Sequence, residues 1–323
     1  MSKGEENMKE SLLLGFDIGG TKCAVCLGRA AGDRVTLLGR RAVPTDLTVP
    51  PGTMLSRLTA LADTLTDGAR PHAVGISCGG PLDAESGRIL SPPNLPGWDD
   101  VPIVPLLSAR YGVPVSLCND ADAGALAEWR WGAGAGCRHM LFLTFGTGLG
   151  AGLILNGRLY RGACGMAGEL GHIRLAPTGP VGYGKSGSFE GFCSGGGIAR
   201  LAAQYAGESR SRGVIPAYPD GATAKDVAEA ARAGDETAGR VFSTCAQKLG
   251  EGLSAVIDLL NPECIVIGSL FGRCHDLLWE KTAAVIRAEA LARSAEVCRI
   301  VPAALGESIG DYAALAAATE TEE

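Results

Sequence analysis

The chain has few aromatic residues, few histidines and no long apolar run. Aromatic residues make up 5% of its 323 positions, and there are four histidines. No stretch reaches the roughly 18 consecutive apolar residues that span a bilayer. The first ten residues, MSKGEENMKE, are too polar for a secretory signal peptide. We therefore expect a cytoplasmic protein with no membrane partner.

Positive charge is not concentrated anywhere in the sequence. Lysine and arginine together number 29 against 35 acidic residues, which gives a formal net charge of −6. Proteins that bind nucleic acids neutralise phosphates with clustered basic side chains. We therefore expect no nucleic-acid partner. The length is that of about two domains.

The eleven cysteines show no disulfide or metal-binding pattern. Their number is odd and they are scattered through apolar contexts, which is typical of reduced, buried thiols. Cys23 and Cys26 are the one pair spaced as C-x-x-C, in a predicted strand. Side chains three apart on a strand point to opposite faces, so we expect no metal or redox site there.

Strand and helix patterns alternate along the sequence, which predicts an α/β protein with mixed sheets. We expect a disordered N-terminus over residues 1–11. An N-terminal α/β domain should follow over 12–120 and a C-terminal α/β domain over 121–307. The C-terminal helix, 308–319, is expected to pack back on the first domain.

Two segments share one plan. LGFDIGGTKCAVCLG (14–28) and LTFGTGLGAGLILNG (143–157) each predict a buried strand, a glycine-rich turn and a second strand. This repeat suggests two domains of like topology. Each would offer a tight turn whose backbone amides could hold a phosphate group, from opposite sides of a cleft.

Two familiar motifs occur in the wrong context. GTGLGA (146–151) fits a dinucleotide-binding fingerprint, which must open a helix, but the sequence continues as a strand. GISCG (75–79) fits the nucleophile elbow of hydrolases, which must also lead into a helix, but turns follow it. We expect residues 75–79 to form a glycine-rich loop that lines a ligand site.

Asp17 ends an apolar strand immediately before the first glycine-rich turn. An acid there is costly to bury without a partner, so it should face a cleft beside a hydrated cation. Thr21 and Lys22 could donate hydrogen bonds to phosphate. The alternatives are a turn-capping aspartate and an ordinary exposed lysine.

Further polar side chains follow predicted strands. Asn119 and Asp120 lie where a strand ends and a helix begins, the position at which α/β sheets bind ligands. The alternative is a pair that caps the helix. We expect Asp122 and Glu128 on the exposed surface of that helix. Asn94, held among prolines, could select a ligand or belong to a plain turn.

Glu169, His172 and Glu190 lie in an unusually glycine-rich stretch, 165–196. Side chains on such loops can converge on a small molecule with many hydroxyl groups. We therefore predict that these three residues bind ligand.

The motifs together resemble the ROK family (repressors, open reading frames and kinases), within the superfamily of sugar kinases, Hsp70 and actin. The likeness spans about residues 12 to 315, and the motifs occur in the family's order. The matching segments are GFDIGGTK (15–22), NDADAGALAE (119–128), GTGLGAG (146–152), GMAGELGHIRL (165–175) and NPECIVIGS (261–269). The resemblance implies two ribonuclease-H-like domains with mixed sheets and a cleft between them.

The resemblance also implies an activity: transfer of the γ-phosphoryl group of ATP to a hydroxyl of a hexose or hexose derivative. Asp120 would be the general base. The implied sugar-binding residues are Asn94, Asn119, Glu169, His172 and Glu190. The implied Mg-ATP site consists of Asp17, Gly19, Gly20, Thr21, Lys22, Gly146, Thr147, Gly148 and Gly268, with Mg²⁺ near Asp17. Members act as glucokinases, fructokinases or N-acylhexosamine kinases, and a homodimer is possible by resemblance.

The zinc motif of the family is missing. The family usually carries C-x-C-G-x-x-G-C-x-E, whose cysteines bind structural zinc with a histidine. In residues 181–190, Val181, Tyr183 and Ser188 stand in their places. One histidine cannot build a tetrahedral site, so we expect no zinc. The loop should instead be ordered by packing of Tyr183 and Phe189.

Two alternatives to a kinase follow from the resemblance. Family repressors carry a winged helix before the first phosphate motif, but about ten residues precede that strand here, so we do not expect a DNA-binding regulator. A non-catalytic sugar sensor is favoured by the missing cysteines and by Ser269, where the family tends to have a second glycine. The intact Asp120 and phosphate motifs favour catalysis.

Overall fold

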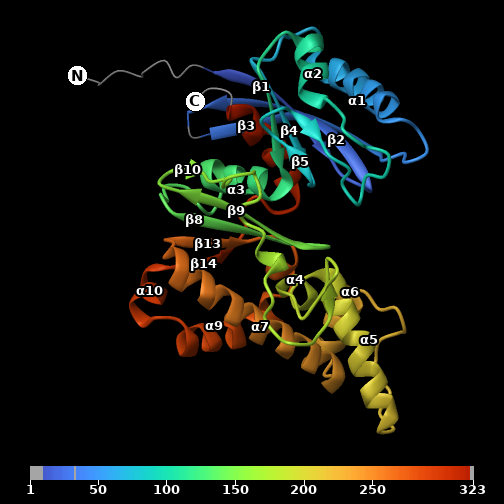
Figure 1. Cartoon of the computed structure of the whole chain (residues 1–323), viewed down its shortest axis with the longest axis vertical. Coiled ribbons are helices and arrows are strands. Elements are labelled where there is room, and N and C mark those ends of the chain that lie inside the picture. Colours follow the sequence, from blue (N-terminus) through green and yellow to red (C-terminus); the bar gives the residue numbers. More distant parts are fainter. Residues whose placement is uncertain (1–9, 33, 321–323) are drawn as a thin grey trace. The chain divides into compact units, whose positions relative to one another are not determined.

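The computed structural model describes residues 10–32 and 34–320, which form two compact units. Unit 1 contains the chain up to Gly136, residues 162–165, and the chain from Ala304 onward; unit 2 contains 137–161 and 166–303. Each unit has a five-stranded mixed sheet with helices (Figure 1). The predicted α/β class is therefore confirmed. Residues 1–9 of the expected disordered N-terminus lie outside the described residues.

The sheet of unit 1 has the strand order β3-β2-β1-β4-β7. Its strands are β1 (Ser11–Ile18), β2 (Lys22–Ala31), β3 (Arg34–Pro44), β4 (Ala73–Cys78) and β7 (Val115–Asn119). The strands β1, β4 and β7 run parallel, whereas β2 is antiparallel to both β1 and β3. Because parallel strands end at one edge, the residues that follow β1, β4 and β7 lie near one another.

Helices cover both faces of this sheet. They are α1 (Pro51–Thr66), α2 (Ile103–Tyr111), α3 (Asp120–Trp131) and α11 (Ile309–Thr319), with the short strands β5 (Leu82–Asp83) and β6 (Arg88–Ile89) and the turn η2 (Gly306–Ser308). Alternate residues of β1 enter two different cores, since Leu14 packs with α1 and α2 while Leu13 packs with α11. Cys23 and Cys26 likewise divide between these cores, so they lie on opposite faces.

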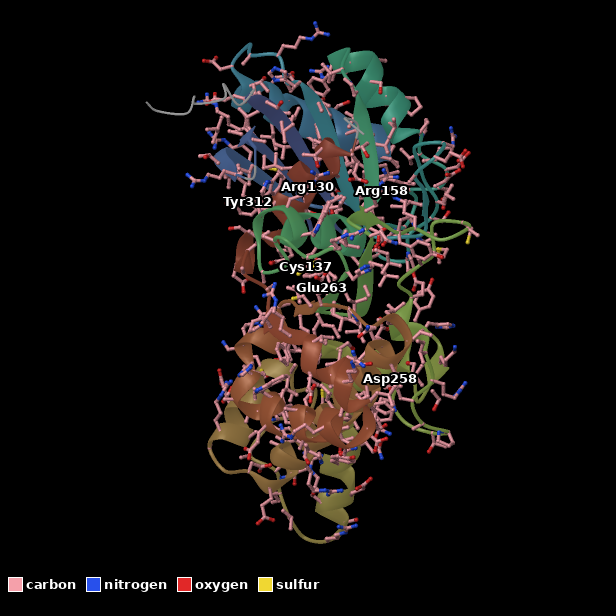
Figure 2. All side chains as sticks on the ribbon, turned by 90° about the vertical axis from the view of Figure 1, so that its left-hand side faces the viewer. Arg130, Cys137, Arg158, Asp258, Glu263 and Tyr312 are labelled. Carbon is pink, nitrogen blue, oxygen red and sulfur yellow. The ribbon has the colours of Figure 1, made fainter. Side chains whose placement is uncertain are left out.

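The alanine-rich helix α11 lies directly on the sheet of unit 1. A β-carbon at position 75 in β4 would come within 2.1 Å of the carbonyl oxygen of Ala314, so this approach needs glycine. The same helix packs against α3, where the rings of Trp131 and Tyr312 lie 6.3 Å apart; Tyr312 is labelled in Figure 2. Unit 1 extends through α3 to Gly136, beyond the boundary predicted near residue 120.

The sheet of unit 2 has the order β10-β9-β8-β13-β14. Its strands are β8 (Met140–Phe145), β9 (Leu149–Leu155), β10 (Arg158–Leu159), β13 (Cys264–Ile267) and β14 (Arg299–Pro302). The hairpin β8–β9 is antiparallel and β8, β13 and β14 are parallel. Thus both copies of the sequence repeat form an antiparallel hairpin that closes on a glycine-rich turn.

The rest of unit 2 is mainly helical. Its elements are η1 (Leu170–His172), β11 (Val181–Gly182), β12 (Lys185–Ser186), α4 (Phe189–Phe192), α5 (Gly195–Ser211), α6 (Ala224–Arg232), α7 (Glu236–Leu260), α8 (Leu270–Arg273), α9 (His275–Glu289) and α10 (Ala292–Val297). Among the described helices of both units, none combines the length and apolarity needed to cross a membrane.

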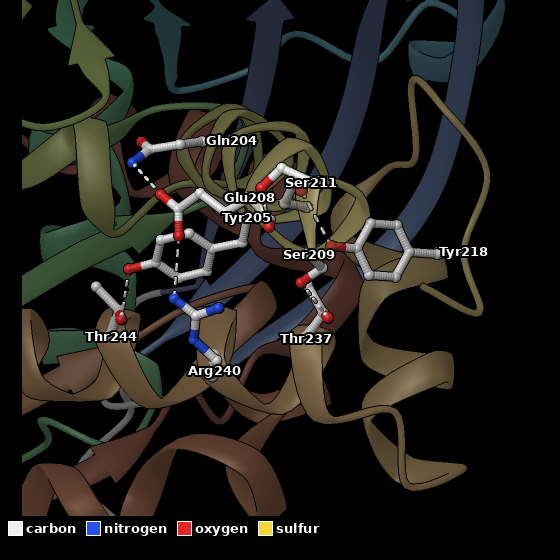
Figure 3. A network of polar contacts seen from close by, with 10 residues as sticks. Gln204, Tyr205, Glu208, Ser209, Ser211, Tyr218, Thr237, Arg240 and Thr244 are labelled. Atoms are coloured by element: carbon white, nitrogen blue, oxygen red, sulfur yellow. Dashed lines mark hydrogen bonds and ion pairs between the residues drawn. The ribbon is translucent and has the colours of Figure 1, made fainter. Parts of the chain in front are cut away.

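Polar contacts fix α5 to α7 (Figure 3). Arg240 donates to the Glu208 carboxylate at 3.1 Å and its guanidinium lies 4.5 Å from the centre of the Tyr205 ring. Ser209 and Thr237 share a buried hydrogen bond of 2.8 Å. The exposed ion pair contributes little stability, whereas the buried hydroxyl pair satisfies groups that would otherwise lose water.

Candidate functional site

The first glycine-rich turn, residues 19–21, connects β1 to β2 and packs tightly on the proline-rich loop. A β-carbon at Gly20 would lie 2.3 Å from the carbonyl oxygen of Asn94, which is closer than any real contact. The Gly19 N–H donates to the carbonyl of Lys22 at 3.2 Å. Thr21 and Lys22 are exposed. Glycine at position 20 therefore brings Asn94 to the edge where β1 ends.

Asp120 begins α3 directly after β7, and the residue is exposed at this position. Its carboxylate accepts a hydrogen bond from the Ala121 N–H at 2.9 Å. Asn119 is the N-cap of the helix, because its Oδ1 also accepts from Ala121, at 3.0 Å. Its Nδ2 lies next to Gly80, where a β-carbon would be 3.3 Å away. The capping alternative thus accounts for the Asn119 oxygen and leaves its amide group directed at the loop 79–80.

The side chains of Asn94 and Asp120 meet around Gly79. A β-carbon there would contact both amide atoms of Asn94, at 3.6 and 3.7 Å, and Oδ2 of Asp120 at 4.0 Å. Ser77 is buried within β4 rather than displayed on an elbow. The loop after β4 therefore borders the two candidate residues, and its glycines leave space beside them.

Three carboxylates lie close together in unit 1. Burial, followed by the charges of Asp311 and Asp120, raises the pKa of Asp17 to about 6. Desolvation by the surrounding protein also raises the pKa of Asp120. Arg40 forms an ion pair of 2.8 Å with Asp311, and Lys22 partly offsets the effect on Asp17. Such a group of acids favours either a bound cation or a proton.

Mg²⁺ prefers oxygen ligands, such as the carboxylates at this edge of the unit 1 sheet. The Asp17 carboxylate also lies against the start of α11, since a β-carbon at Gly310 would be 2.8 Å from Oδ2. Among the described residues no group of three or more acids could hold a metal ion, so a magnesium bound to phosphate would have Asp17 as its protein ligand here.

The second turn, residues 146–148, lies against the start of α5 in unit 2. The N–H groups of Gly195 and Gly196 donate to the carbonyls of Gly146 and Thr147, at 2.8 and 3.4 Å. These bonds fix the turn at one end of β8. A β-carbon at Gly146 would lie 3.9 Å from Oγ of Ser269.

Gly268 joins the same region, because its N–H donates to the Leu143 carbonyl in β8 at 2.9 Å. Ser269 follows with φ 53° and ψ −107°, a conformation suited to glycine. The structure thus brings Gly146, Thr147 and Gly268 together at the ends of the parallel strands β8 and β13.

Glu190, Glu169 and His172 border the second turn through a loop that lies flat on β9. The Glu190 carboxylate accepts from the Leu149 N–H at 3.1 Å, and a β-carbon at Gly148 would be 2.7 Å from it. A β-carbon at Gly171 would come within 2.1 Å of the Leu149 carbonyl. The loop is rich in glycine because its backbone touches that of the strand.

Glu169 and His172 are the N-cap and last residue of the short 3₁₀-helix η1. Both side chains are exposed. The Lys185 ammonium donates to the His172 carbonyl at 2.7 Å and joins the two loops. Unit 2 therefore places the Glu190 carboxylate at the second turn, with Glu169 and His172 exposed on the adjoining loop.

Comparison with known proteins identifies the family of the chain. The model of the ROK family matches residues 13–320. The chain belongs to the ROK family. It is 33% identical to a glucokinase of Halalkalibacterium halodurans over 312 aligned residues, and this alignment covers 94% of this chain and 93% of that protein.

Solved ROK structures have the same fold. A ROK hexokinase from Thermus thermophilus superposes with a TM-score of 0.79 at 31% identity, covering 97% of this chain and 99% of that one. A ROK glucokinase from Streptomyces griseus, solved with glucose and AMPPNP, gives 0.75 at 30% identity, covering 96% and 99%. The fold is thus that of the superfamily of sugar kinases, Hsp70 and actin.

The loop that carries zinc cysteines in the ROK family is held here in another way. Ser188, at one cysteine position, is buried, accepts from the Gly191 N–H at 3.1 Å and donates to the Gly182 carbonyl at 3.3 Å. Phe189 is buried, as expected, and packs on Gly252. Tyr183 is 70% exposed, so our expectation that it orders the loop is wrong.

Tyr183 still lies edge-on to His172, with ring centres 6.2 Å apart. Among residues 10–32 and 34–320, no group of three or more His, Cys, Asp or Glu side chains could hold a metal ion. The absence of zinc stays a prediction.

Two acids of the ROK motif NDADAGALAE were placed wrongly by sequence reasoning. Asp122 is 5% exposed and Glu128 is fully buried, whereas we expected both on the helix surface. The prediction failed because every residue of α3 from Ala121 to Glu128 is buried, so this part of the helix has no exposed face. The small residues between the acids were the available signal, because they allow other elements to pack on every side of the helix.

Proposed function

We propose that this ROK protein is an ATP-dependent kinase that phosphorylates a hydroxyl group of a hexose or hexose derivative, with Asp120 as general base. The observation that carries the proposal is the Asp120 carboxylate at the start of α3, which lies with the Asn94 amide around Gly79. A general base must lie within reach of the hydroxyl proton that it accepts. The space beside Gly79 offers that position next to a side chain that can orient the sugar.

Asp120 is suited to this role by its surroundings. Desolvation by the surrounding protein raises the pKa of its carboxyl, which makes the carboxylate a stronger base than an unperturbed aspartate. The Ala121 N–H fixes one of its oxygens and leaves the other toward Gly79. Asn94 and the amide group of Asn119 would donate and accept hydrogen bonds with sugar hydroxyls. Phosphoryl transfer passes through a loose transition state, so positioning by these residues supplies most of the rate enhancement.

The two glycine-rich turns would hold the nucleotide phosphates with their backbone amides. In this proposal Gly19, Gly20, Thr21 and Lys22 contribute the first turn and Gly146, Thr147 and Gly148 the second. Asp17 would hold Mg²⁺, which neutralises phosphate charge when it is bound. Gly268 would lie beside the nucleoside at the ends of β8 and β13.

Glu169, His172 and Glu190 would bind the remaining sugar hydroxyls. Their carboxylates accept hydrogen bonds and the imidazole can both donate and accept, which suits a polyol. Glucose is the first candidate substrate because the related proteins reported above include glucokinases. A cytoplasmic location and a homodimer belong to the same proposal.

The test is ADP release from Mg-ATP across a panel of hexoses, N-acylhexosamines and ketoses. We expect turnover with at least one sugar, and Asp120→Asn and Asp120→Ala should lower it by about 10²- to 10⁴-fold while sugar binding is retained. Asp63→Asn, which removes an exposed aspartate on α1, is the control and should leave turnover unchanged. Equal rates for wild type and Asp120→Ala would disprove the assignment.

A non-catalytic sugar sensor is the second candidate. It is favoured by the replacement of the family's zinc cysteines with Val181, Tyr183 and Ser188. The same panel separates the two functions. A sugar that raises the melting temperature without any ADP release would support the sensor.

A further inference from the structure

Among the described acids of unit 1, Glu128 is the most completely buried. Its side-chain carboxylate accepts hydrogen bonds from backbone N–H groups of three residues, which lie where the chain leaves or re-enters unit 1. Its Oε2 accepts from the N–H groups of Ala133, at 2.7 Å, and Ala304, at 3.2 Å. Its Oε1 accepts from Leu305 at 2.9 Å. A β-carbon at Gly132 would come within 2.1 Å of Oε2, so the carboxylate fits closely beneath the chain.

These amides lie beside two of the places where the chain passes from one unit to the other. The chain leaves unit 1 after Gly136 and returns to it at Ala304, and residues 162–165 of the chain between these points also belong to unit 1. Ala133 therefore lies three residues before the first connection, and Ala304 is the first residue after the second. One carboxylate holds both segments within unit 1.

Unit 2 fixes the other ends of the same segments. The Glu263 carboxylate accepts from the N–H groups of Arg138 and His139, at 2.6 and 2.8 Å (Figure 2). The N–H of Ala303 donates to the carbonyl of Ile267 at 2.9 Å. These bonds anchor the chain on the far side of each connection.

The anchors leave very short stretches between them. The N–H groups of Gly134 and Ala135 also donate to carbonyls within unit 1, which leaves residues 136–137 as the first stretch. Gly136 has φ 82°, a conformation that glycine adopts without strain. The second is the single peptide unit between Ala303, held by unit 2, and Ala304, held by Glu128. Rotation confined to so few bonds makes each stretch a hinge, since hinges are a few residues that absorb a change in backbone angles.

We propose that Glu128 is a positioning residue, which joins the two hinges through one carboxylate and so sets the pivot for the alignment of the reacting groups. The inference rests on the proposed kinase function. Glu128 is fully buried, so it acts through the connecting segments. Misplacement of reacting groups by about 1 Å can cost about 10²-fold in rate, which makes the pivot important to catalysis.

The test compares Glu128→Gln with Leu58→Ala. Glutamine keeps the size of the side chain but replaces one of the two acceptor oxygens with an NH₂ group, which would face an amide donor. Leu58 is fully buried in α1 and its truncation destabilises the core of unit 1 without touching the hinges. Both variants are assayed well below their melting temperatures for sugar turnover and for amide hydrogen exchange.

We expect Glu128→Gln to lower kcat by about tenfold or more with little change in the KM for sugar. The amides of Ala133, Ala304 and Leu305 should lose their protection. Leu58→Ala should lower the melting temperature while kcat and these three amides stay as in the wild type. A Glu128→Gln variant with lower melting temperature but wild-type kcat would overturn the proposal and leave a purely structural role.

A failure of the kinase function can be told apart from a failure of this inference. If the wild type turns over no sugar, the function is wrong, and the hinge is then measured by small-angle scattering with and without glucose and AMPPNP. A ligand-dependent change in radius of gyration that Glu128→Gln abolishes supports the pivot. An equal change in both proteins, or none in the wild type, overturns it.

Discussion

The two glycine-rich turns share a backbone plan but have different surroundings. Each closes an antiparallel hairpin in a five-stranded sheet. The first turn follows Asp17, whose neighbours Asp120 and Asp311 raise its pKa together with burial. The second turn is held by amides from the start of α5 and by Glu190, which accepts a backbone hydrogen bond. The same local fold thus lies beside clustered acids in unit 1 and beside a hydrogen-bonded carboxylate in unit 2.

The carboxylates beside the two turns should also affect the stability of the folded protein in opposite directions. A carboxylate whose pKa is raised in the folded protein is held there at the expense of stability whenever it is ionised. A carboxylate that accepts a backbone amide contributes stability. Asp17 belongs to the first kind and Glu190 to the second, so amide substitutions should separate them.

The largest effect is expected for Asp17→Asn. The pKa of Asp17 is about 6 in the folded chain and 3.8 when unperturbed. The native state therefore keeps a proton that the unfolded state has lost between about pH 4 and 6, and wild-type stability falls as pH rises through this window. Asparagine cannot ionise, so at pH 7.5 the variant should be about 2–3 kcal/mol more stable, while kinase activity is lost.

Urea unfolding at pH 4 and pH 7.5 measures this difference. The gain of Asp17→Asn should nearly vanish at pH 4, where the native wild-type side chain is itself neutral. Glu190→Gln is the matched variant in unit 2 and should instead cost about 1 kcal/mol at pH 7.5, because it weakens the bond to the Leu149 N–H. Two variants that shift stability in the same direction would contradict the comparison.

The next largest effect is a difference in stability between alanine substitutions in the two turns. Gly20→Ala would place a methyl group 2.3 Å from the Asn94 carbonyl, so the backbone must move, at a cost of about 1–3 kcal/mol. Displacement of Asn94 should also raise the KM for sugar. Gly146→Ala meets Ser269 at an ordinary 3.9 Å, and its stability should stay within about 0.5 kcal/mol of the wild type.

Unfolding in urea together with sugar kinetics distinguishes these variants. If Gly146→Ala were as destabilised as Gly20→Ala, the second turn would be packed as tightly as the first. That outcome would remove the structural contrast between them.

Sequence reasoning located the residues that lie at strand ends. Asp17 lies near the end of β1 and Asp120 directly follows β7, and both strands run parallel to β4, so the local pattern and one general rule were enough to bring them to one edge. The two hairpins were likewise visible because alternating burial and glycine-rich turns are local features. The family resemblance supplied the roles that geometry leaves open.

What sequence reasoning missed depends on contacts between distant residues. Glu128 is buried because the segment 304–305 returns to it from the far end of the chain, which no pattern within α3 encodes. Tyr183 is exposed because Ser188 and Phe189 already hold the loop. In both cases the partner, rather than the residue itself, determines burial.

The smallest change in stability is expected for a substitution at Ser269, which lies beside the second turn. Its φ of 53° and ψ of −107° suit glycine, and a side chain there costs about 1–3 kcal/mol. Ser269→Gly relieves this strain but loses the 2.8 Å hydrogen bond from Arg273 and gains chain entropy in the unfolded state. We expect a net gain of about 1 kcal/mol in urea unfolding. Ser269→Ala, which loses the hydrogen bond and keeps the strain, should gain nothing, and a gain equal to that of glycine would show that the backbone there is unstrained.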